Sequence, residues 1–367
     1  MDFTLTEEQS LLRDTARAYF AKMSDKRVHP ARADQVWADV SAMGWLSIMV
    51  PEGAGGVGGS MIDGCLLARE LGRGHARVPF TETAILGSIA FARDLRMLQQ
   101  IAAGEVKIAF ALQDDQAEPL RFQKREGGYI LCGTKAFVTC AVGTAVFIVK
   151  AYDETGNVPA LFAVSSEAPL AKLNAYPTLD GMGAVGITFD RLDVGGDACL
   201  ALGDAGKDII DQLELSACLA YSAEAVGLME FLVSATREYT ATREQFGQPL
   251  SAFQVVRHKL VEMYALTQLT ESLVFQAVDT FNRLGASAES LQAVRAAFSY
   301  AARQGRRVGK EAIQLHGAIG TMDEVPIGCA FARLVAISQS CGGASLHERR
   351  YVEDLLSIGD TSRLWAL

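Results

Sequence analysis

The chain has 367 residues, half of them hydrophobic and 21% charged, which is an ordinary globular balance with enough sequence for a large buried core. Its 34 basic and 43 acidic residues give a formal net charge of −9 without a basic run of the kind that follows a nucleic-acid backbone, so nucleic acid is not an expected partner. Seven scattered cysteines without a C-x-x-C pair, and five histidines without metal-ligand spacing, favour a reduced, cytoplasmic protein with no metal site.

The first part of the chain is typical of helices up to about residue 104. It opens with T-E-E-Q at residues 6–9, a capping box, and the apolar positions that follow fall on one helical face. Further helical patterns cover residues 36–43, 62–71 and 83–102. We therefore predict an N-terminal helical domain over residues 1–104. The acid at position 2 and the early interruption of apolar stretches predict neither a secretory signal nor a membrane span.

The pattern changes after Gly104 to short alternating segments separated by turn residues, at 107–112, 128–138, 145–152, 159–164 and 185–194. These predict a middle antiparallel β domain over residues 105–203. Four long helical patterns then follow, at about 206–240, 251–283, 288–316 and 327–358, and they predict a C-terminal four-helix bundle over residues 204–367. The expected fold class is mainly α with a β insert.

The segment R-E-Q-F-G-Q-P-L at residues 243–250, with Gln254 after it, is the most informative stretch of the chain. It joins Arg243, the aromatic Phe246, a Gly-x-Pro turn and a glutamine. An arginine fork binds phosphate oxygens, so these parts suit a phosphate-bearing cofactor with an aromatic ring. Taken alone, the segment could be a corner between two helices. It resembles the flavin-binding signature of the acyl-CoA dehydrogenase family, in which the arginine and the glutamine reach a neighbouring subunit's FAD.

Two further segments resemble parts of the same family. Q-L-H-G-A-I-G at 314–320 is similar to its Q-x-x-G-x-x-G segment, so the resemblance implies that Gln314, Gly317 and Gly320 lie at the pyrophosphate and adenosine part of FAD. K-A-F-V-T at 135–139 is similar to the strand in which an aromatic covers the flavin ring and a threonine hydroxyl bonds it near N5, which implies that Phe137, Val138 and Thr139 bind flavin. Without the resemblance, the glycines could be a helix cap and the strand a half-buried one. The order of elements matches the family fold over the whole chain.

The sequence departs from the family where its catalytic base stands. The glutamate of the family's Y-E-G-T-S segment is replaced by Cys341, and the alternative base position on the first bundle helix is occupied by Ala217. Two acids lie near Ala217, but Glu214 is about 4.5 Å away along the helix axis and some 60° round the face, and Glu224 is about 10.5 Å away. We interpret both as structural carboxylates and only weak candidates for the base.

A second departure concerns the loop that holds the chain's own FAD pyrophosphate in the family. The family's T-E-P-G-A-G-S-D is replaced by Q-D-D-Q-A-E-P at residues 113–119, which places three acids where phosphates are expected. The groups that serve a neighbour's flavin are thus kept, while part of the set for the chain's own flavin is lost. Phe137 and Thr139 are the exception.

The resemblance therefore implies a flavoprotein that takes part in α,β-dehydrogenation of an acyl-CoA thioester, with FAD as hydride acceptor and an electron-transfer flavoprotein or similar acceptor. The departures favour a subunit without its own base, in a two-chain bacterial acyl-CoA dehydrogenase that degrades fatty or steroid acyl groups. A homo- or hetero-tetramer is expected to assemble through the C-terminal helices, whose apolar stripe includes Leu260, Met263, Leu266 and Leu269. Two alternatives stay open: a homotetrameric dehydrogenase with an unorthodox base, and a flavin-dependent monooxygenase of the same fold.

Overall fold

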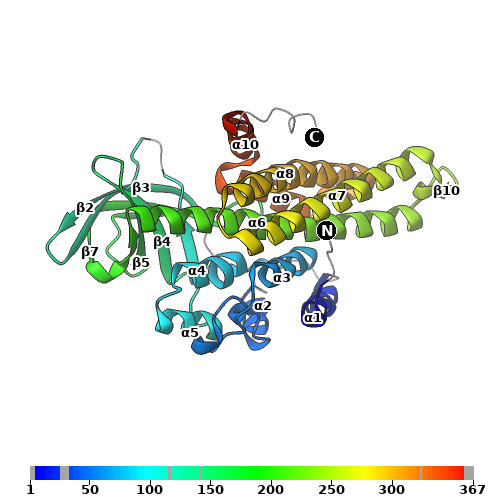
Figure 1. Ribbon diagram of the computed structural model, residues 1–367. Helices are drawn as coiled ribbons and strands as arrows, with labels where there is room; N and C mark the ends of the chain where they lie inside the picture. Colours follow the sequence, from blue (N-terminus) through cyan, green and yellow to red (C-terminus); the bar gives the residue numbers. More distant parts are fainter. Residues whose placement is uncertain (1–4, 25–32, 115–116, 140–142, 323–324, 359–367) are drawn as a thin grey trace. The chain divides into compact units, whose positions relative to one another are not determined.

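The computed structural model of the protein describes residues 5–24, 33–114, 117–139, 143–322 and 325–358 (Figure 1). Its contacts divide the chain into two compact units, each assembled from separate stretches of sequence. The first unit comprises Met1–His29, Met61–Ala76 and Cys218–Leu367, and the second comprises Pro30–Ser60 and Arg77–Ala217. The N-terminal helical segment contributes to both units, and the sequence-based division at residues 104 and 203 remains a proposal about domains.

The second unit combines short helices with a sheet. Its helical segments are α2 (Ala33–Ala42), a π-helical segment Thr81–Gly87, α4 (Ser88–Ala90) and α5 (Leu95–Ala103), with short 3-10 turns at Trp45–Ser47, Glu52–Ala54 and Gly196–Ala198. The side chain of Asp94 caps α5 by accepting a hydrogen bond from Met97 N at 3.0 Å. The strands are β1 (Ile108–Ala111), β2 (Arg121–Arg125), β3 (Gly128–Thr139), β4 (Val146–Asp153), β5 (Pro159–Ser165), β6 (Lys172–Tyr176), β7 (Ala184–Gly195) and β8 (Cys199–Leu202).

The sheet is mostly antiparallel, in the order β6-β7-β3-β2-β4-β5-β8, and β1 also pairs with β4. The predicted antiparallel β domain also contains two parallel pairs, β1–β4 and β2–β4. Successive side chains of each strand point to opposite faces of the sheet, and those on one face form a core that includes Leu131, Phe162, Ile187 and Phe189. The predicted fold class, helices followed by a β insert and then helices, is confirmed.

The first unit is helical. It contains α1 (Glu7–Ser24), α3 (Met61–Arg73), most of α6 (Asp204–Thr242), α7 (Gln254–Leu284), α8 (Ala288–His316), α9 (Pro326–Gln339) and α10 (Ala344–Ile358), together with the hairpin strands β9 (Glu244–Gln245) and β10 (Gln248–Pro249) and the 3-10 turns Leu250–Ala252, Gly317–Thr321 and Ser340–Gly342. In Figure 1, α6 and α7 run side by side to the end of the bundle that carries β10.

Local signals in the sequence explain several of these boundaries. Thr6 and Gln9 exchange hydrogen bonds at the start of α1, so the predicted capping box is confirmed. Ser287 caps α8 by accepting from Ser290 N at 3.2 Å, and α8 has the predicted bounds. The single helix predicted over 327–358 is wrong, because α9 ends at Gln339 and α10 begins at Ala344. Between these two helices, Gly342 and Gly343 both have positive φ, which a continuous helix cannot accommodate.

Two glycines let α3 and α6 approach backbone to backbone. A Cβ atom at Gly227 would lie 1.8 Å from the main-chain oxygen of Arg69, and one at Gly72 would lie 2.2 Å from that of Glu224. Only hydrogen fits at either position. The approach also brings charged side chains of the two helices together, since Arg69 and Arg73 both form ion pairs with Glu230.

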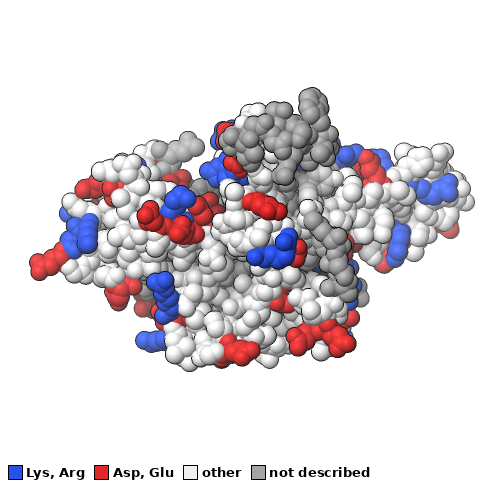
Figure 2. Space-filling model, viewed as in Figure 1, with Lys and Arg blue, Asp and Glu red and all other residues white. Residues whose placement is uncertain are grey.

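The length and hydropathy of α6 are at odds with the expectation that no apolar stretch of the chain could cross a bilayer. It is long and apolar enough by length and composition, but 78% of its most apolar window is buried within the structure. Burial in a folded core accounts for such a window. On the face of the molecule in Figure 2, acidic and basic side chains are interspersed rather than gathered in one patch.

Candidate functional site

The segment between α6 and α7 forms a tight hairpin that presents Phe246 to solvent. Strands β9 and β10 pair antiparallel, and the two residues between them, Phe246 and Gly247, have φ of 54° and 80°. Positive φ at both central positions is the signature of a type I′ turn, which favours Asn or Gly at the first of them. Phe246 instead places a large apolar ring there, and its side chain is 91% exposed. Phe253 lies beside it, with ring centroids 6.2 Å apart.

Arg243 and Gln254 flank this hairpin. Arg243 follows the last residue of α6, and its carbonyl oxygen accepts a hydrogen bond from Leu250 N at 2.9 Å, which closes the base of the loop. Its side chain is exposed, and the guanidinium forms no ion pair or hydrogen bond with any residue that the structure describes. Gln254 begins α7, is also exposed, and lies with Nε2 3.5 Å from His258 Nε2. The hairpin therefore offers a free cation, an amide and an aromatic ring.

The other predicted cofactor residues of this unit lie where α8 ends. Gln314 and Gly317 are exposed, and Gly320 is buried. Gly317 has φ 65° and ψ −145°, a backbone conformation that only glycine adopts readily. The ring of Tyr239, one turn before Arg243, stacks on His316 with centroids 4.4 Å apart and an interplanar angle of 21°. The structure thus joins the ends of α6 and α8, which carry the two predicted motifs.

Phe137, Val138 and Thr139 belong to the second unit, at the end of β3. The register of β3 against β7 shifts between Lys135 and Val138, and this bulge gives Phe137 a φ of 49° and leaves its ring half exposed. Bulges re-aim side chains, which is consistent with a functional position. Val138 is fully buried in the sheet core, so only its backbone could contact a cofactor. Thr139 is partly exposed.

The two positions predicted for the base, Cys341 and Ala217, carry no carboxylate, and a histidine lies near the first of them. Cys341 lies in the turn between α9 and α10 with φ 54°, and its carbonyl oxygen is 2.9 Å from Nε2 of His347 on α10. Because a carbonyl oxygen can only accept, Nε2 carries the proton and donates it. The same nitrogen is 3.7 Å from Sγ of Cys218, the buried neighbour of Ala217. This contact was not predicted, because residue 347 matched no motif.

The two acids considered as alternative bases each have a cationic partner. Both oxygens of Glu224 bind Arg333 on α9, at 2.6 and 2.8 Å, and both side chains are about nine-tenths buried. The guanidinium of Arg333 also lies 5.7 Å from the ring centroid of Tyr221. Glu214, at the start of α6 in the second unit, accepts from Lys150 Nζ at 3.3 Å. Each carboxylate is therefore held by an ion pair within its own unit.

The loop after β1 requires a correction. Asp114 was interpreted as a charge that repels phosphate, but its Oδ1 lies 2.5 Å from Nζ of Lys135, a side chain that is fully buried. Burial lowers the pKa of Lys135 to about 8, although Asp114 acts in the opposite direction. The charge of Asp114 is compensated inside the sheet, so that part of the repulsion argument is wrong. Asp115 lies outside the described residues.

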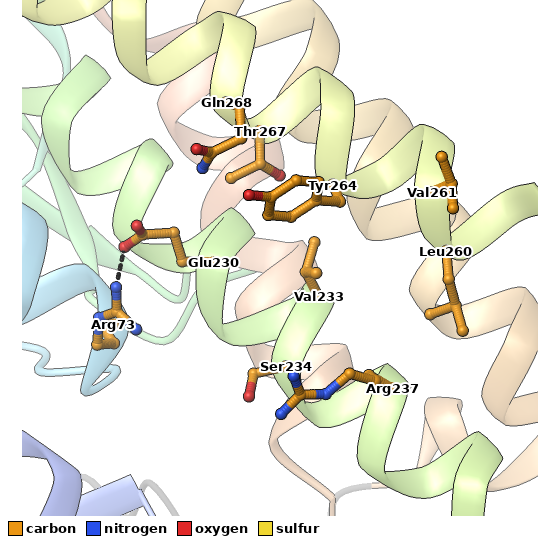
Figure 3. A pocket seen from close by; sticks show the side chains of 10 residues that line it. All are labelled: Arg73, Glu230, Val233, Ser234, Arg237, Leu260, Val261, Tyr264, Thr267 and Gln268. Atoms are coloured by element: carbon orange, nitrogen blue, oxygen red, sulfur yellow. Dashed lines mark hydrogen bonds and ion pairs between the residues drawn. The ribbon is translucent and has the colours of Figure 1, made fainter. Parts of the chain in front are cut away.

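A pocket of about 360 Å³ lies between α6 and α7, with Arg73 of α3 at its edge (Figure 3). None of the predicted cofactor residues lines it. Glu230 on its wall is one of three glutamates that form a charge network with three arginines, so these six ionic groups balance one another. The network consists of Arg17, Arg69, Arg73, Glu70, Glu230 and Glu271. The pocket is thus separate from the flavin motifs.

The expected apolar stripe on α7 faces mostly inward. Met263 is buried, Leu260 and Leu266 are half-buried, and only Leu269 is exposed. The exposed large apolar side chains of α7 are Leu269 and four others, Val255, Val261, Tyr264 and Leu284.

Comparison with known proteins places this chain among flavoenzyme sequences and structures. The sequence model of the acyl-CoA dehydrogenase N-terminal domain matches residues 6–93, and that of the acyl-CoA dehydrogenase C-terminal domain matches residues 214–352. Acyl-CoA dehydrogenase FadE28 of Mycobacterium tuberculosis is 30% identical over 284 residues, which are 76% of this chain and 77% of the relative. Acyl-CoA dehydrogenase FadE27 of the same organism is 28% identical over 337 residues, 88% of each chain.

Solved structures of acyl-CoA dehydrogenases have the same fold as this chain. A chain of the ChsE4-ChsE5 complex from Mycobacterium tuberculosis superposes with a TM-score of 0.88 at 25% identity, covering 97% of this chain and 99% of that one. A variant of the steroid ACAD Tcur3481-Tcur3483 gives a TM-score of 0.85 at 28% identity, with the same coverage. With both domain models matched in order and a relative at 30% identity over three quarters of its length, this chain belongs to the acyl-CoA dehydrogenase family.

Proposed function

We propose that this chain is a subunit of a two-chain acyl-CoA dehydrogenase that lacks its own catalytic base. It lends side chains and backbone from the hairpin and from the end of α8 to an FAD held mainly by a related partner chain, and the partner also supplies the base. Bound there, FAD supplies the hydride acceptor for dehydrogenation of an acyl-CoA thioester. The lending residues are Arg243, Phe246, Gln254, Gln314, Gly317 and Gly320.

The conformation of Phe246 is the observation that carries this proposal. A phenylalanine with left-handed backbone costs about 1–2 kcal/mol, and an apolar ring that is 91% exposed gains no burial in return. Nothing in the described fold uses that ring as core. Next to it, Arg243 has a guanidinium without a partner among the described residues. Exposed aromatic and cationic side chains at a locally unfavourable turn support a role in binding a group outside this chain.

Neither of the two candidate acids is a free carboxylate, and this supports the assignment of the base to a partner. Glu224 is engaged on both oxygens by Arg333, and Glu214 is paired with Lys150. A base must reach the substrate proton, and a carboxylate held on both oxygens by a buried guanidinium is poorly placed to do so. Cys341 and Ala217 offer no substitute.

The substrate and partner proposals rest on the relatives. One similar structure is a complex of two different chains, and another is described as a steroid ACAD. We therefore propose a hetero-tetramer of two copies of this chain and two of a related chain, acting in the cytoplasm on an acyl-CoA with a bulky group such as a steroid side chain. An electron-transfer flavoprotein or a similar protein would reoxidise the flavin.

Co-expression with a related acyl-CoA dehydrogenase chain that has an intact base tests the proposal. We expect light scattering to show a tetramer that holds about one FAD per two chains, and we expect this chain alone to bind FAD poorly. Arg243→Ala should lower FAD affinity roughly tenfold or more, because a charged phosphate contact is worth about 1.5–3 kcal/mol. Arg283→Ala removes an exposed arginine of α7 that pairs with Asp279, and it should leave FAD affinity unchanged.

Exposure of Phe137 in its bulge favours the second candidate, a homotetramer that holds its own flavin. Reduction of bound flavin by an acyl-CoA with this chain alone would establish that candidate and refute the subunit proposal. Glu214→Gln and Glu224→Gln would then identify the base. Oxygen consumption by the chain with reduced flavin, without acyl-CoA dehydrogenation, would instead indicate a monooxygenase.

A further inference from the structure

A pair of stacked rings connects the two flavin motifs of the helical unit. Tyr239 lies in the last turn of α6, and its carbonyl oxygen accepts from Arg243 N at 2.8 Å. His316 is the last residue of α8 and lies between Gln314 and Gly317. The rings are nearly parallel, with centroids 4.4 Å apart, and Tyr239 Oη donates to the carbonyl oxygen of His316 at 3.4 Å. Each ring is thus within one helical turn of a predicted cofactor residue.

The orientation of the imidazole is fixed by a second contact. Nδ1 of His316 lies 2.8 Å from the carbonyl oxygen of Ala312, and since that oxygen can only accept, Nδ1 carries the proton. The side chain is 6% exposed, and burial lowers its pKa, which favours the neutral ring in the stack. One hydrogen bond to its own helix and one aromatic face against α6 therefore hold the ring as a rigid spacer.

The opposite side of the hairpin is connected to α8 differently. Lys259, on the first turns of α7, forms an ion pair with Glu311 of α8, and both side chains are partly exposed. Partly exposed pairs of this kind contribute little stability and weaken with salt. On the side of Arg243, by contrast, α6 contacts α8 through the stack of Tyr239 on His316.

We propose that Tyr239 and His316 are positioning residues that set the separation between Arg243 and the Gln314–Gly317 backbone, so that both motifs can engage one FAD at once. This inference rests on the proposed function. Neither ring needs to touch the cofactor. Two motifs that contact one cofactor bind it more tightly when their spacing is already fixed before binding. Loosening one helix end would remove this gain in FAD affinity.

The test compares Tyr239→Leu, Tyr239→Phe and Tyr300→Leu in the co-expressed complex. Tyr239→Leu removes the aromatic face and should lower FAD affinity about three- to tenfold, the range of a single aromatic pair. Tyr239→Phe keeps the face and should stay within about twofold of the parent. Tyr300→Leu makes the same chemical change on α8 about 24 Å from His316, and FAD affinity should not change.

Several outcomes separate positioning from general stability. Assembly measured by light scattering should be unaffected in all three variants, since a merely structural loss would disrupt the complex. The combination Tyr239→Leu/His316→Leu should lose less affinity than the two single losses combined, because each change breaks the same contact. Full additivity would overturn the coupling.

Arg243→Ala separates failure of this inference from failure of the proposed function. If Arg243→Ala loses FAD while Tyr239→Leu retains it, the positioning role is refuted and the subunit role stands. If Arg243→Ala also retains FAD, the subunit role itself falls. Hydrogen exchange on the chain alone gives a second readout: Tyr239→Leu should accelerate exchange of the Leu250 amide and of the Gly317–Thr321 turn, but not within α9. Unchanged exchange at both places would also overturn the proposal.

Discussion

The buried pair between Glu224 and Arg333 gives the sharpest prediction about this fold. We expect Arg333→Met to destabilise the helical unit strongly, because the methionine fills similar space but leaves the Glu224 carboxylate buried without its cation. The two hydrogen bonds, at 2.6 and 2.8 Å, engage both oxygens, and both side chains are about nine-tenths buried. Removing one partner of such a pair costs about 3–5 kcal/mol.

Removing both charges should cost far less. In the double variant Glu224→Leu/Arg333→Met no ion remains to be desolvated, and apolar side chains of similar volume replace the pair, so a change within about 2 kcal/mol of the parent is expected. The coupling between the two sites should then be roughly 3 kcal/mol or more in a double-mutant cycle. Arg283→Ala serves as the control, since its pair with Asp279 is exposed and should contribute under about 0.5 kcal/mol.

Urea unfolding followed by far-ultraviolet circular dichroism measures these differences. The reasoning is refuted if Arg333→Met costs less than about 1 kcal/mol, or if the double variant loses the sum of both single losses. The same variants address catalysis. A folded Glu224→Leu/Arg333→Met subunit in the co-expressed complex should keep acyl-CoA turnover, and its loss would indicate that Glu224 acts as the base after all.

Three further changes test other parts of the structure. The buried Lys135 has a pKa of about 8 against an ordinary 10.5, so between these pH values the unfolded chain binds more protons than the folded chain. The free energy of unfolding should therefore rise with pH in this range, by up to roughly 3 kcal/mol. Lys135→Met should flatten that rise in a pH series of thermal unfolding. Phe246→Asn places a residue that suits the left-handed turn, so it should raise the free energy of unfolding by about 1 kcal/mol in urea denaturation. The same change should lower the FAD affinity of the complex. Unchanged affinity would remove the main support for the subunit role. Gly227→Ala forces a methyl group against the α3 backbone and should cost about 3 kcal/mol, whereas Gly53→Ala, with open space around it, should be nearly neutral in the same assay.

Sequence patterns predicted the elements well where a local signal fixes a boundary. The capping box at Thr6 and the cap at Ser287 both act within one helical turn, so they can be recognised without tertiary information. The break between α9 and α10 carried an equally local signal in Gly342 and Gly343. Adjacent glycines predict a helix stop, so this break could be predicted from the sequence.

Contacts between distant residues were beyond the reach of these patterns. Asp114 was judged by its loop alone, and its charge is compensated by Lys135 on a neighbouring strand. Val138 was counted among the flavin residues, although alternation along β3 points its side chain into the sheet core. Arg333 and His347 matched no motif, because a partner is chosen by the packing of helices and not by spacing in the chain.

The contrast between internally paired groups and exposed, unpaired groups supports the proposal that this chain works with a partner. In the described parts of the helical unit, Glu224 is bound on both oxygens by Arg333, and the Cys341 carbonyl accepts from His347. A buried site that has lost its function gains stability when its polar groups pair internally. The hairpin shows the opposite, since Phe246 and Arg243 stay exposed at a turn that a smaller residue would stabilise. Local disadvantage is retained only where a binding partner compensates for it, so this contrast favours a chain that completes a cofactor site outside itself.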